Sequence, residues 1–142
     1  MTATRLPVSP DPFVIRTDFE NRQTWEIICD LIRAPVHEAG DTFFANVSFL
    51  DDTELRNLSQ KDLLERLSGD YRHSFIFVVD SVTITHPEFP VLVIDLNSER
   101  GRGFRAVPSQ VQAIENNLSI SNMDFFEFAD NIDEDGIFRG FR

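Results

Sequence analysis

Residues 75–79 read Phe-Ile-Phe-Val-Val, a continuous apolar run bounded by Ser74 and Asp80. Such a run predicts a strand that is buried on both faces, near the middle of a sheet. Residues 91–94, Val-Leu-Val-Ile, have the same character, and residues 86–90, His-Pro-Glu-Phe-Pro, have the composition of a turn. The connection is short for a parallel crossover, so we expect the two strands to form an antiparallel hairpin.

Working outward from this hairpin, the alternation and spacing of apolar residues predict the remaining elements. Segments rich in aromatic and β-branched residues predict further strands at 13–17, 42–50, 103–107 and 137–141. Apolar residues three and four apart predict helices at 21–33, 59–68, 108–118 and 121–129. Helix starts are indicated by Asn21 as an N-cap, by a capping box at Ser59 and Asp62, and by Pro108 in a first turn.

This order of elements predicts an α+β (mixed α/β) domain. We expect a largely antiparallel sheet of about five or six strands, with three or four helices packed on it. Residues 1–12 contain three of the seven prolines and predict an irregular lead-in, so the single domain is expected at 13–142. A chain of 142 residues is long enough to bury a core without disulfides.

Composition and charge limit the classes of partner and the compartment. A formal net charge of −11 argues against nucleic acid and anionic membranes, and favours a partner with a basic surface. Cys29 is the only cysteine, which is typical of a reducing compartment. No secretory signal or membrane-spanning stretch is recognisable in the sequence, so we expect a cytoplasmic protein.

Three aspartates follow predicted strands and form one candidate site. They are Asp18, Asp80 and Asp95. If the hairpin turn is centred between residues 87 and 88, Asp80 lies opposite Asp95, and two facing carboxylates require a cation or a shared proton between them. Arg16 or Arg105 is the favoured cation, and a divalent metal ion is the alternative. The alternative function is therefore a divalent-metal-dependent or carboxylate-based enzyme that uses these aspartates.

Other catalytic and metal-binding signals are incomplete. The nucleophile motifs G-x-S-x-G and S-x-x-K are missing, as are the phosphate-binding glycine loops. Asn131, Asp133, Asp135 and Gly136 match the start of a calcium-binding loop, but its twelfth position holds Arg142 instead of a bidentate glutamate. An enzymatic function is therefore not indicated. No cofactor is expected, and a divalent cation is the alternative.

The second candidate site is an acidic segment near the end of the chain. Residues 106–138 contain seven acidic residues and no Lys or Arg. Phe126 is expected to project among the acidic groups, as an aromatic anchor does on a binding surface. The predicted partner-binding residues are Glu115, Asp124, Phe126, Glu127 and Asp130. The alternative is an acidic face that serves solubility alone.

Several blocks of the sequence resemble a family of small bacterial proteins known as a domain of unknown function. The longest blocks are Pro90–Leu96, Arg102–Ser109, Ile114–Phe125 and Asp135–Phe141, and shorter ones are Arg16–Phe19 and Tyr71–Phe75. The resemblance covers nearly the whole chain and implies a one-domain protein, without an implied activity or functional residue. Together these observations predict a non-enzymatic protein-interaction domain, with an immunity or antitoxin-like neutralisation of a basic partner as one form of that function.

Overall fold

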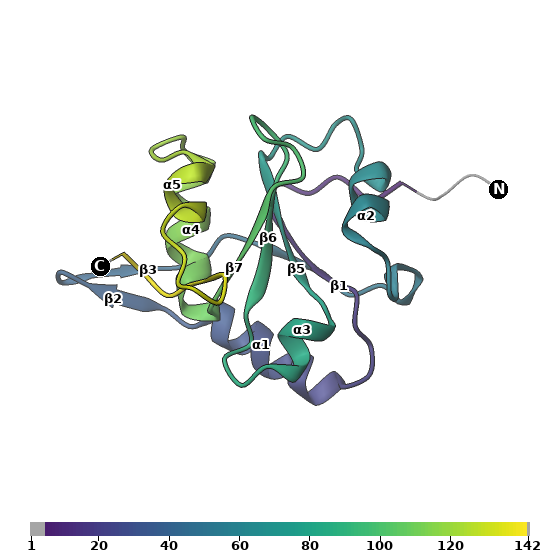
Figure 1. Ribbon diagram of the computed structural model, residues 1–142, viewed down its shortest axis with the longest axis horizontal. Helices are drawn as coiled ribbons and strands as arrows, with labels where there is room; N and C mark the ends of the chain where they lie inside the picture. Colours follow the sequence, from purple (N-terminus) through teal and green to yellow (C-terminus); the bar gives the residue numbers. More distant parts are fainter. Residues whose placement is uncertain (1–4, 142) are drawn as a thin grey trace.

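The computed structural model describes residues 5–141 as one α/β domain (Figure 1). Its strands are β1 (Phe13–Arg16), β2 (Val36–Glu38), β3 (Asp41–Phe43), β4 (Ser48–Leu50), β5 (Phe75–Val79), β6 (Val91–Asp95), β7 (Gly103–Ala106) and β8 (Ile137–Phe138). Its α-helices are α1 (Arg22–Arg33), α2 (Gln60–Arg66), α3 (Ser81–Thr85), α4 (Val111–Ser119) and α5 (Phe125–Ala129). Two short 3₁₀ turns, η1 (Thr53–Leu55) and η2 (Pro108–Gln110), precede α2 and α4.

Six of these strands form one mixed sheet in the order β4-β1-β5-β6-β7-β8. The pairs β1–β4, β1–β5 and β7–β8 are parallel, whereas β5–β6 and β6–β7 are antiparallel. The strands β2 and β3 form a separate antiparallel hairpin. The expectation of a largely antiparallel sheet is therefore wrong. Because α1 and the β2–β3 hairpin lie between β1 and β4, the chain has room for a crossover and returns in the same direction.

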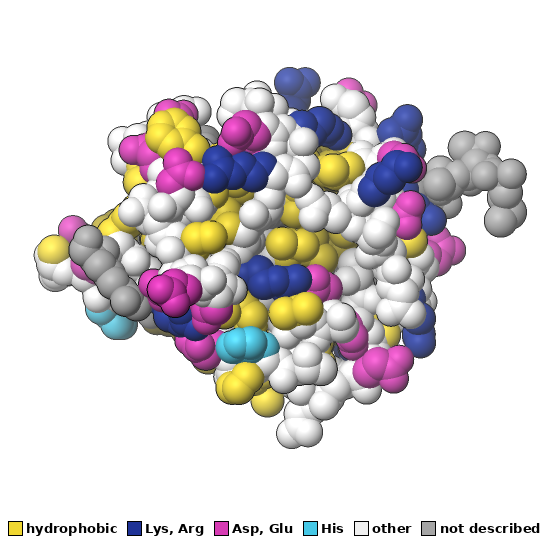
Figure 2. All heavy atoms as spheres, viewed as in Figure 1, with side chains coloured by type: hydrophobic (Ala, Val, Ile, Leu, Met, Phe, Trp, Pro, Cys, Tyr) yellow, Lys and Arg dark blue, Asp and Glu magenta, His cyan; other side chains and the backbone are white. Residues whose placement is uncertain are grey.

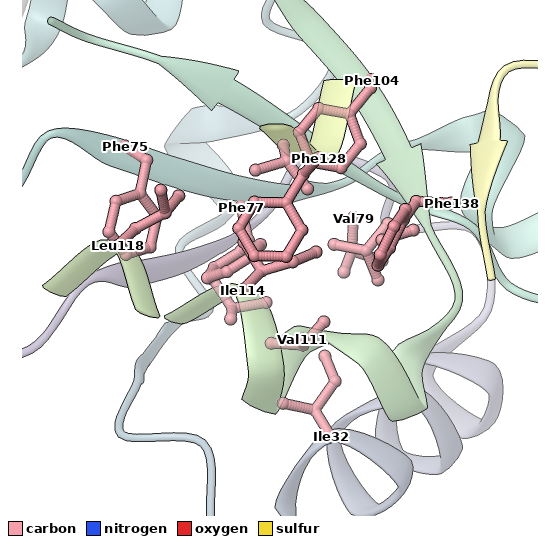
Figure 3. Packing of buried hydrophobic residues seen from close by; sticks show 14 of the residues in the cluster. Ile32, Phe75, Phe77, Val79, Phe104, Val111, Ile114, Leu118, Phe128 and Phe138 are labelled. Atoms are coloured by element: carbon pink, nitrogen blue, oxygen red, sulfur yellow. The ribbon is translucent and has the colours of Figure 1, made fainter. Parts of the chain in front are cut away.

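Helices cover both faces of the sheet and create two cores. On one face α1, α4 and α5 pack on the strands, and Figure 3 shows Val111, Ile114 and Leu118 directed toward the buried phenylalanines of the sheet. On the opposite face α2 contributes Leu63 to a smaller cluster that includes Ile76 (Figure 1). The strand β5 has all five residues buried, which confirms its predicted central position.

The predicted helix starts are confirmed at two caps. The side chain of Asn21 accepts a hydrogen bond from the backbone N–H of Thr24, which begins α1. Ser59 and Asp62 form the capping box that begins α2. The lead-in, from residue 5 onward, has no helix or strand before β1, but Leu6 is buried in the smaller cluster. The first four residues of the predicted lead-in lie outside the described part of the chain.

Two predicted elements differ in the structure. The segment 42–50 is not one strand, because β3 ends at Phe43 and β4 begins at Ser48. The backbone N–H of Asn46 in the intervening segment donates to the side chain of Glu115 at 2.6 Å, where a strand would bond to a neighbouring strand. Similarly, the predicted strand 137–141 is limited to the two residues of β8.

Candidate functional site

Three parallel strands end at the same edge of the sheet, and each is followed by an aspartate. Asp51 follows β4, Asp18 lies two residues after β1, and Asp80 follows β5. The chain leaves β1 for α1 on one face and leaves β4 for α2 on the other. In open α/β sheets, ligands bind outside the carboxyl ends of strands where the connections change face. This edge is therefore the first candidate site, and Asp51 is a member that the sequence analysis missed.

Asp80 is held in an ion pair with Arg105 of β7. The guanidinium nitrogens Nη1 and Nη2 donate to Oδ1 and Oδ2 of Asp80 at 2.9 and 2.7 Å. The same carboxylate caps α3 by accepting from the backbone N–H of Thr83. Burial raises the pKa of Asp80, but the hydrogen bonds from Arg105 and Thr83 outweigh it and hold the pKa below its usual value. Arg105 is one of the two arginines expected between Asp80 and Asp95, and it pairs with Asp80 alone.

Asp51 is held by a second arginine. Arg16, which is only 2% exposed, donates from Nη1 to Oδ1 of Asp51 at 3.1 Å. Its guanidinium also lies 4.3 Å from the ring centre of Phe19 and 5.4 Å from that of Trp25. The planar cation is thus fixed by aromatic faces and by a carboxylate, an arrangement that suits arginine better than lysine.

Asp18 differs from its two neighbours because no arginine pairs with its carboxylate among residues 5–141. The residue is 8% exposed, and its Oδ1 accepts one hydrogen bond, from the backbone N–H of Glu20 at 2.9 Å. Arg16 Nε donates to the backbone carbonyl of Asp18, not to its side chain. A mostly buried carboxylate with a single backbone donor is costly unless water or a ligand completes its hydrogen bonds.

Asp95 lies at the other end of the sheet, so its predicted pairing with Asp80 is wrong. In the observed register Asp95 faces Phe75, and Val78 faces Leu92. The helix α3 takes up residues 81–85 in the connection and shifts the register of the hairpin. Asp95 accepts instead from the backbone N–H groups of Asn97 and Glu99 and shapes the loop before β7. Within the described part of the chain, no three His, Cys, Asp or Glu residues are placed to hold a metal ion.

A pocket of about 410 Å³ opens at the same edge, between the ends of β1 and β5 and the start of α2. Asp18, Asp80 and Arg105 are its charged lining residues. Its neutral lining consists of Thr17, Asn57, Leu58, Ser59, Gln60, Ser81 and Leu92. Hydrophobic side chains are visible over the central strands in Figure 2, with basic and acidic side chains next to them. The pocket therefore combines two apolar residues, Leu58 and Leu92, with one carboxylate that no arginine pairs among the described residues.

The second candidate site, the acidic segment, is only partly on the surface. Glu115 is 2% exposed, and its carboxylate accepts hydrogen bonds from Asn46, Asn116 and Ser119. The prediction that Glu115 belongs to a partner-binding surface is wrong. Glu115 lies on the buried face of α4 with Val111, Ile114 and Leu118. The segment before β4 folds over it, and the carboxylate satisfies the backbone N–H of Asn46.

The other four predicted residues lie together at α5. Phe126 is 50% exposed, and Asp124 and Asp130 line a pocket with it. Glu127 accepts from the backbone N–H of Asp124 at 2.8 Å and begins the helix. Figure 2 shows a hydrophobic side chain among acidic ones at the end of the molecule where α5 lies. We call these four residues, Asp124, Phe126, Glu127 and Asp130, the α5 surface.

Arginines from other elements reduce the charge around this segment. Arg102 donates to Glu99 at 2.7 Å and also pairs with Asp130. At the predicted calcium loop, Arg139 pairs with Asp133 and Asp135 as well as with Glu88. These contacts place a guanidinium between the carboxylates that a calcium ion would need. They also account for the lowered pKa of Glu88 and Asp135, because Arg139 stabilises both ionised forms.

Fold and site together define a small α/β domain with a mixed sheet, a polar pocket at the carboxyl ends of its parallel strands and an acidic helix at the opposite sheet edge. The chain belongs to the family described as a domain of unknown function, DUF6924, whose model matches residues 11–141. This confirms the resemblance seen in the sequence. Comparison with curated proteins finds no match. Among residues 5–141, each helix is too short or too polar to cross a membrane.

Proposed function

We propose that this domain is a non-enzymatic interaction module that binds a protein with a basic surface through the α5 surface. The observation that carries the proposal is the half-exposed aromatic ring of Phe126 beside Asp124 and Asp130. Aromatic residues at the centre of an interface supply much of the binding energy, while surrounding charges steer the partner and set its specificity. The net charge of −11 favours encounter with a cationic protein and disfavours nucleic acid and anionic membranes.

An immunity or antitoxin-like role is the form of this function that we propose. In that role the domain would neutralise a basic effector by covering its surface. A cytoplasmic location is part of the proposal and is supported by Cys29, a single cysteine buried in the core. The alternative, a metal-dependent or carboxylate enzyme, has less support, because Asp80 is already paired with Arg105 and Asp95 lies at the other end of β6.

The test is capture of a partner on the immobilised protein at low salt, followed by elution with increasing salt. We expect a basic protein that is retained by the wild type and by Ile27→Ser, and lost with Phe126→Ser. Ile27 is a matched control, because it is 43% exposed on α1, a helix that lies apart from α5 in Figure 1. Charge removal in Asp124→Asn with Asp130→Asn is expected to lower the salt at which the partner elutes.

The proposal requires that capture depends on Phe126 and on salt. Retention of the same protein by Phe126→Ser, or retention that does not change with salt, would contradict it. For the antitoxin-like role, the captured protein must also have an activity that is lost when the wild type is added and preserved when Phe126→Ser is added.

A further inference from the structure

Beyond this protein-interaction function, the geometry points to a second site. We propose that the pocket at the carboxyl ends of β1 and β5 binds a small aliphatic cation, an ammonium or guanidinium group, with Asp18 as its anchor. This strand-end pocket is separate from the α5 surface and shares no lining residue with the pocket there.

The first step of the argument is the state of the Asp18 carboxylate. Its Oδ1 accepts from the backbone N–H of Glu20, and its Oδ2 has no hydrogen-bond donor among the described residues. In the same part of the chain, every fully buried side-chain nitrogen or oxygen has a partner. Oδ2 is therefore not fully buried, although the residue as a whole is only 8% exposed. Because Asp18 lines the strand-end pocket, we infer that Oδ2 is accessible from it.

The second step is the charge of the pocket. The carboxylate of Asp80 and the guanidinium of Arg105 neutralise each other through two hydrogen bonds. Asp18 is the remaining charged lining residue, so the pocket retains one negative charge. An anionic ligand would therefore meet an uncompensated carboxylate, whereas a cation would compensate it. A hydrogen bond between charged groups in a partly buried site is also stronger than one between neutral groups.

The third step is the shape and polarity of the remaining lining. Leu58 and Leu92 provide apolar walls for an aliphatic stem. Ser59 and the side-chain amide of Gln60 provide neutral oxygen acceptors. The amide nitrogen of Gln60 already donates a hydrogen bond to the carbonyl of Gly101. A primary ammonium group has three N–H donors, so one can bind the Asp18 carboxylate and the others can bind the oxygens of Ser59 and Gln60. A few precisely placed polar groups fix the orientation of a ligand in small-molecule sites.

The test uses butylammonium and ethylguanidinium as probes, with butanol and butyrate as controls of the same apolar stem. Amide NMR spectra of the whole chain are recorded during each titration. We expect saturable shifts at Asp18, Glu20, Ser59 and Ser81 with the two cations, and none with the two controls. Shifts that butanol reproduces, or cation-induced shifts confined to other residues, would overturn the proposal. Absence of binding at tens of millimolar cation would do the same.

Asp18→Asn is the decisive variant, since the amide oxygen keeps the acceptor for Glu20 while the charge is removed. We expect its affinity for butylammonium to fall roughly tenfold or more, as for a lost charge-assisted hydrogen bond. Asp70→Asn is the matched control, because Asp70 is exposed and outside this pocket, and it should bind as the wild type does. Equal affinity in Asp18→Asn would overturn the proposal, and the wild-type NMR map remains decisive if that variant does not fold.

A parallel titration distinguishes the source of the cation. The peptide acetyl-Gly-Lys-Gly-amide presents the same ammonium as a side chain of a protein. Binding of both butylammonium and the peptide would support the site and admit a protein side chain as its occupant. Binding of butylammonium alone would support the site and assign it to a free small molecule.

Discussion

The guanidinium of Arg105 connects the ends of three adjacent strands through its pairing with Asp80. Arg105 lies on β7, Asp80 follows β5, and the same guanidinium donates at 3.1 Å to the carbonyl of Pro90, which precedes β6. One side chain thus fixes the place where the α3 connection leaves and rejoins the sheet. Because both side chains are mostly buried, loss of either partner leaves a charge with little access to water.

We therefore expect Arg105→Ala to lower the free energy of unfolding by about 2–3 kcal/mol, the cost of a buried charge without its partner. Urea denaturation provides the measurement. The double variant Arg105→Ala with Asp80→Ala should be more stable than the sum of the single losses implies. Strict additivity would contradict the coupling, and Lys61→Ala, which removes a highly exposed ion pair, should change stability by no more than about 0.5 kcal/mol.

The lowered pKa of Asp80 predicts a particular dependence of stability on pH. Its pKa is below the ordinary value of 3.8 in the folded protein, so the unfolded chain binds the proton more readily. The stabilisation from ionised Asp80 is complete above that ordinary value and is lost as the pH falls below it, through the folded pKa. The difference in unfolding free energy between the wild type and Asp80→Asn should thus be constant near neutrality and shrink below about pH 4.

Comparison with Asp80→Asn is needed because other carboxylates titrate in the same range. Glu88 and Asp135 also have a lowered pKa, from hydrogen bonds to Arg139, and they contribute to both curves equally. A difference that grows toward low pH would mean that Asp80 is not stabilised as an anion by Arg105.

The buried position of Glu115 predicts a structural role. Glu115→Ala removes the acceptor for the backbone of Asn46 and for Ser119, and should lower the free energy of unfolding by about 2–3 kcal/mol. Glu134→Ala is the matched control in the same acidic segment, since Glu134 is exposed. Its effect should stay within about 0.5 kcal/mol. Thermal or urea unfolding measures both, and equal effects would contradict the assignment.

Burial also predicts an unreactive thiol at Cys29. Burial raises the pKa of Cys29 to about 11, and the side chain lies in the core between α1 and the sheet. At pH 8 the folded protein should react with a thiol reagent much more slowly than the protein in guanidinium chloride, because little thiolate is present and access is blocked. Similar rates in the two states, followed by absorbance, would show that the thiol is accessible.

Local sequence patterns predict the helices and strands better than they predict which strands pair. The five apolar residues of β5 and the caps at Asn21 and Ser59 act within a few neighbours, and the structure confirms them. The parallel contacts of β1 with β4 and β5 join segments far apart in the chain, and no local pattern encodes them. The β-branched stretch 81–85 favours a strand, yet it forms α3, because Asp80 and Thr83 make a capping box.

The same distinction applies to the candidate sites. Asp18 and Asp80 could be found because an aspartate after an apolar strand is a local signal, and Asp51 carries that signal after Leu50. The sequence does not single out Asp51, because it predicts one strand at 42–50 and no crossover that would bring the end of that strand beside β1. Glu115 shows the opposite error, since a count of charges does not distinguish a surface carboxylate from one that bonds a distant backbone.

The position of β1 also has a consequence for the order of folding. Among the strands of residues 5–141, β1 is made first, yet its two partners, β4 and β5, follow much later in the chain. The meander of β5, β6 and β7 joins neighbouring segments and costs less loop entropy to form. During synthesis β4 is therefore the first partner that β1 meets, and the other side of β1 stays without its strand partner until β5 has been made.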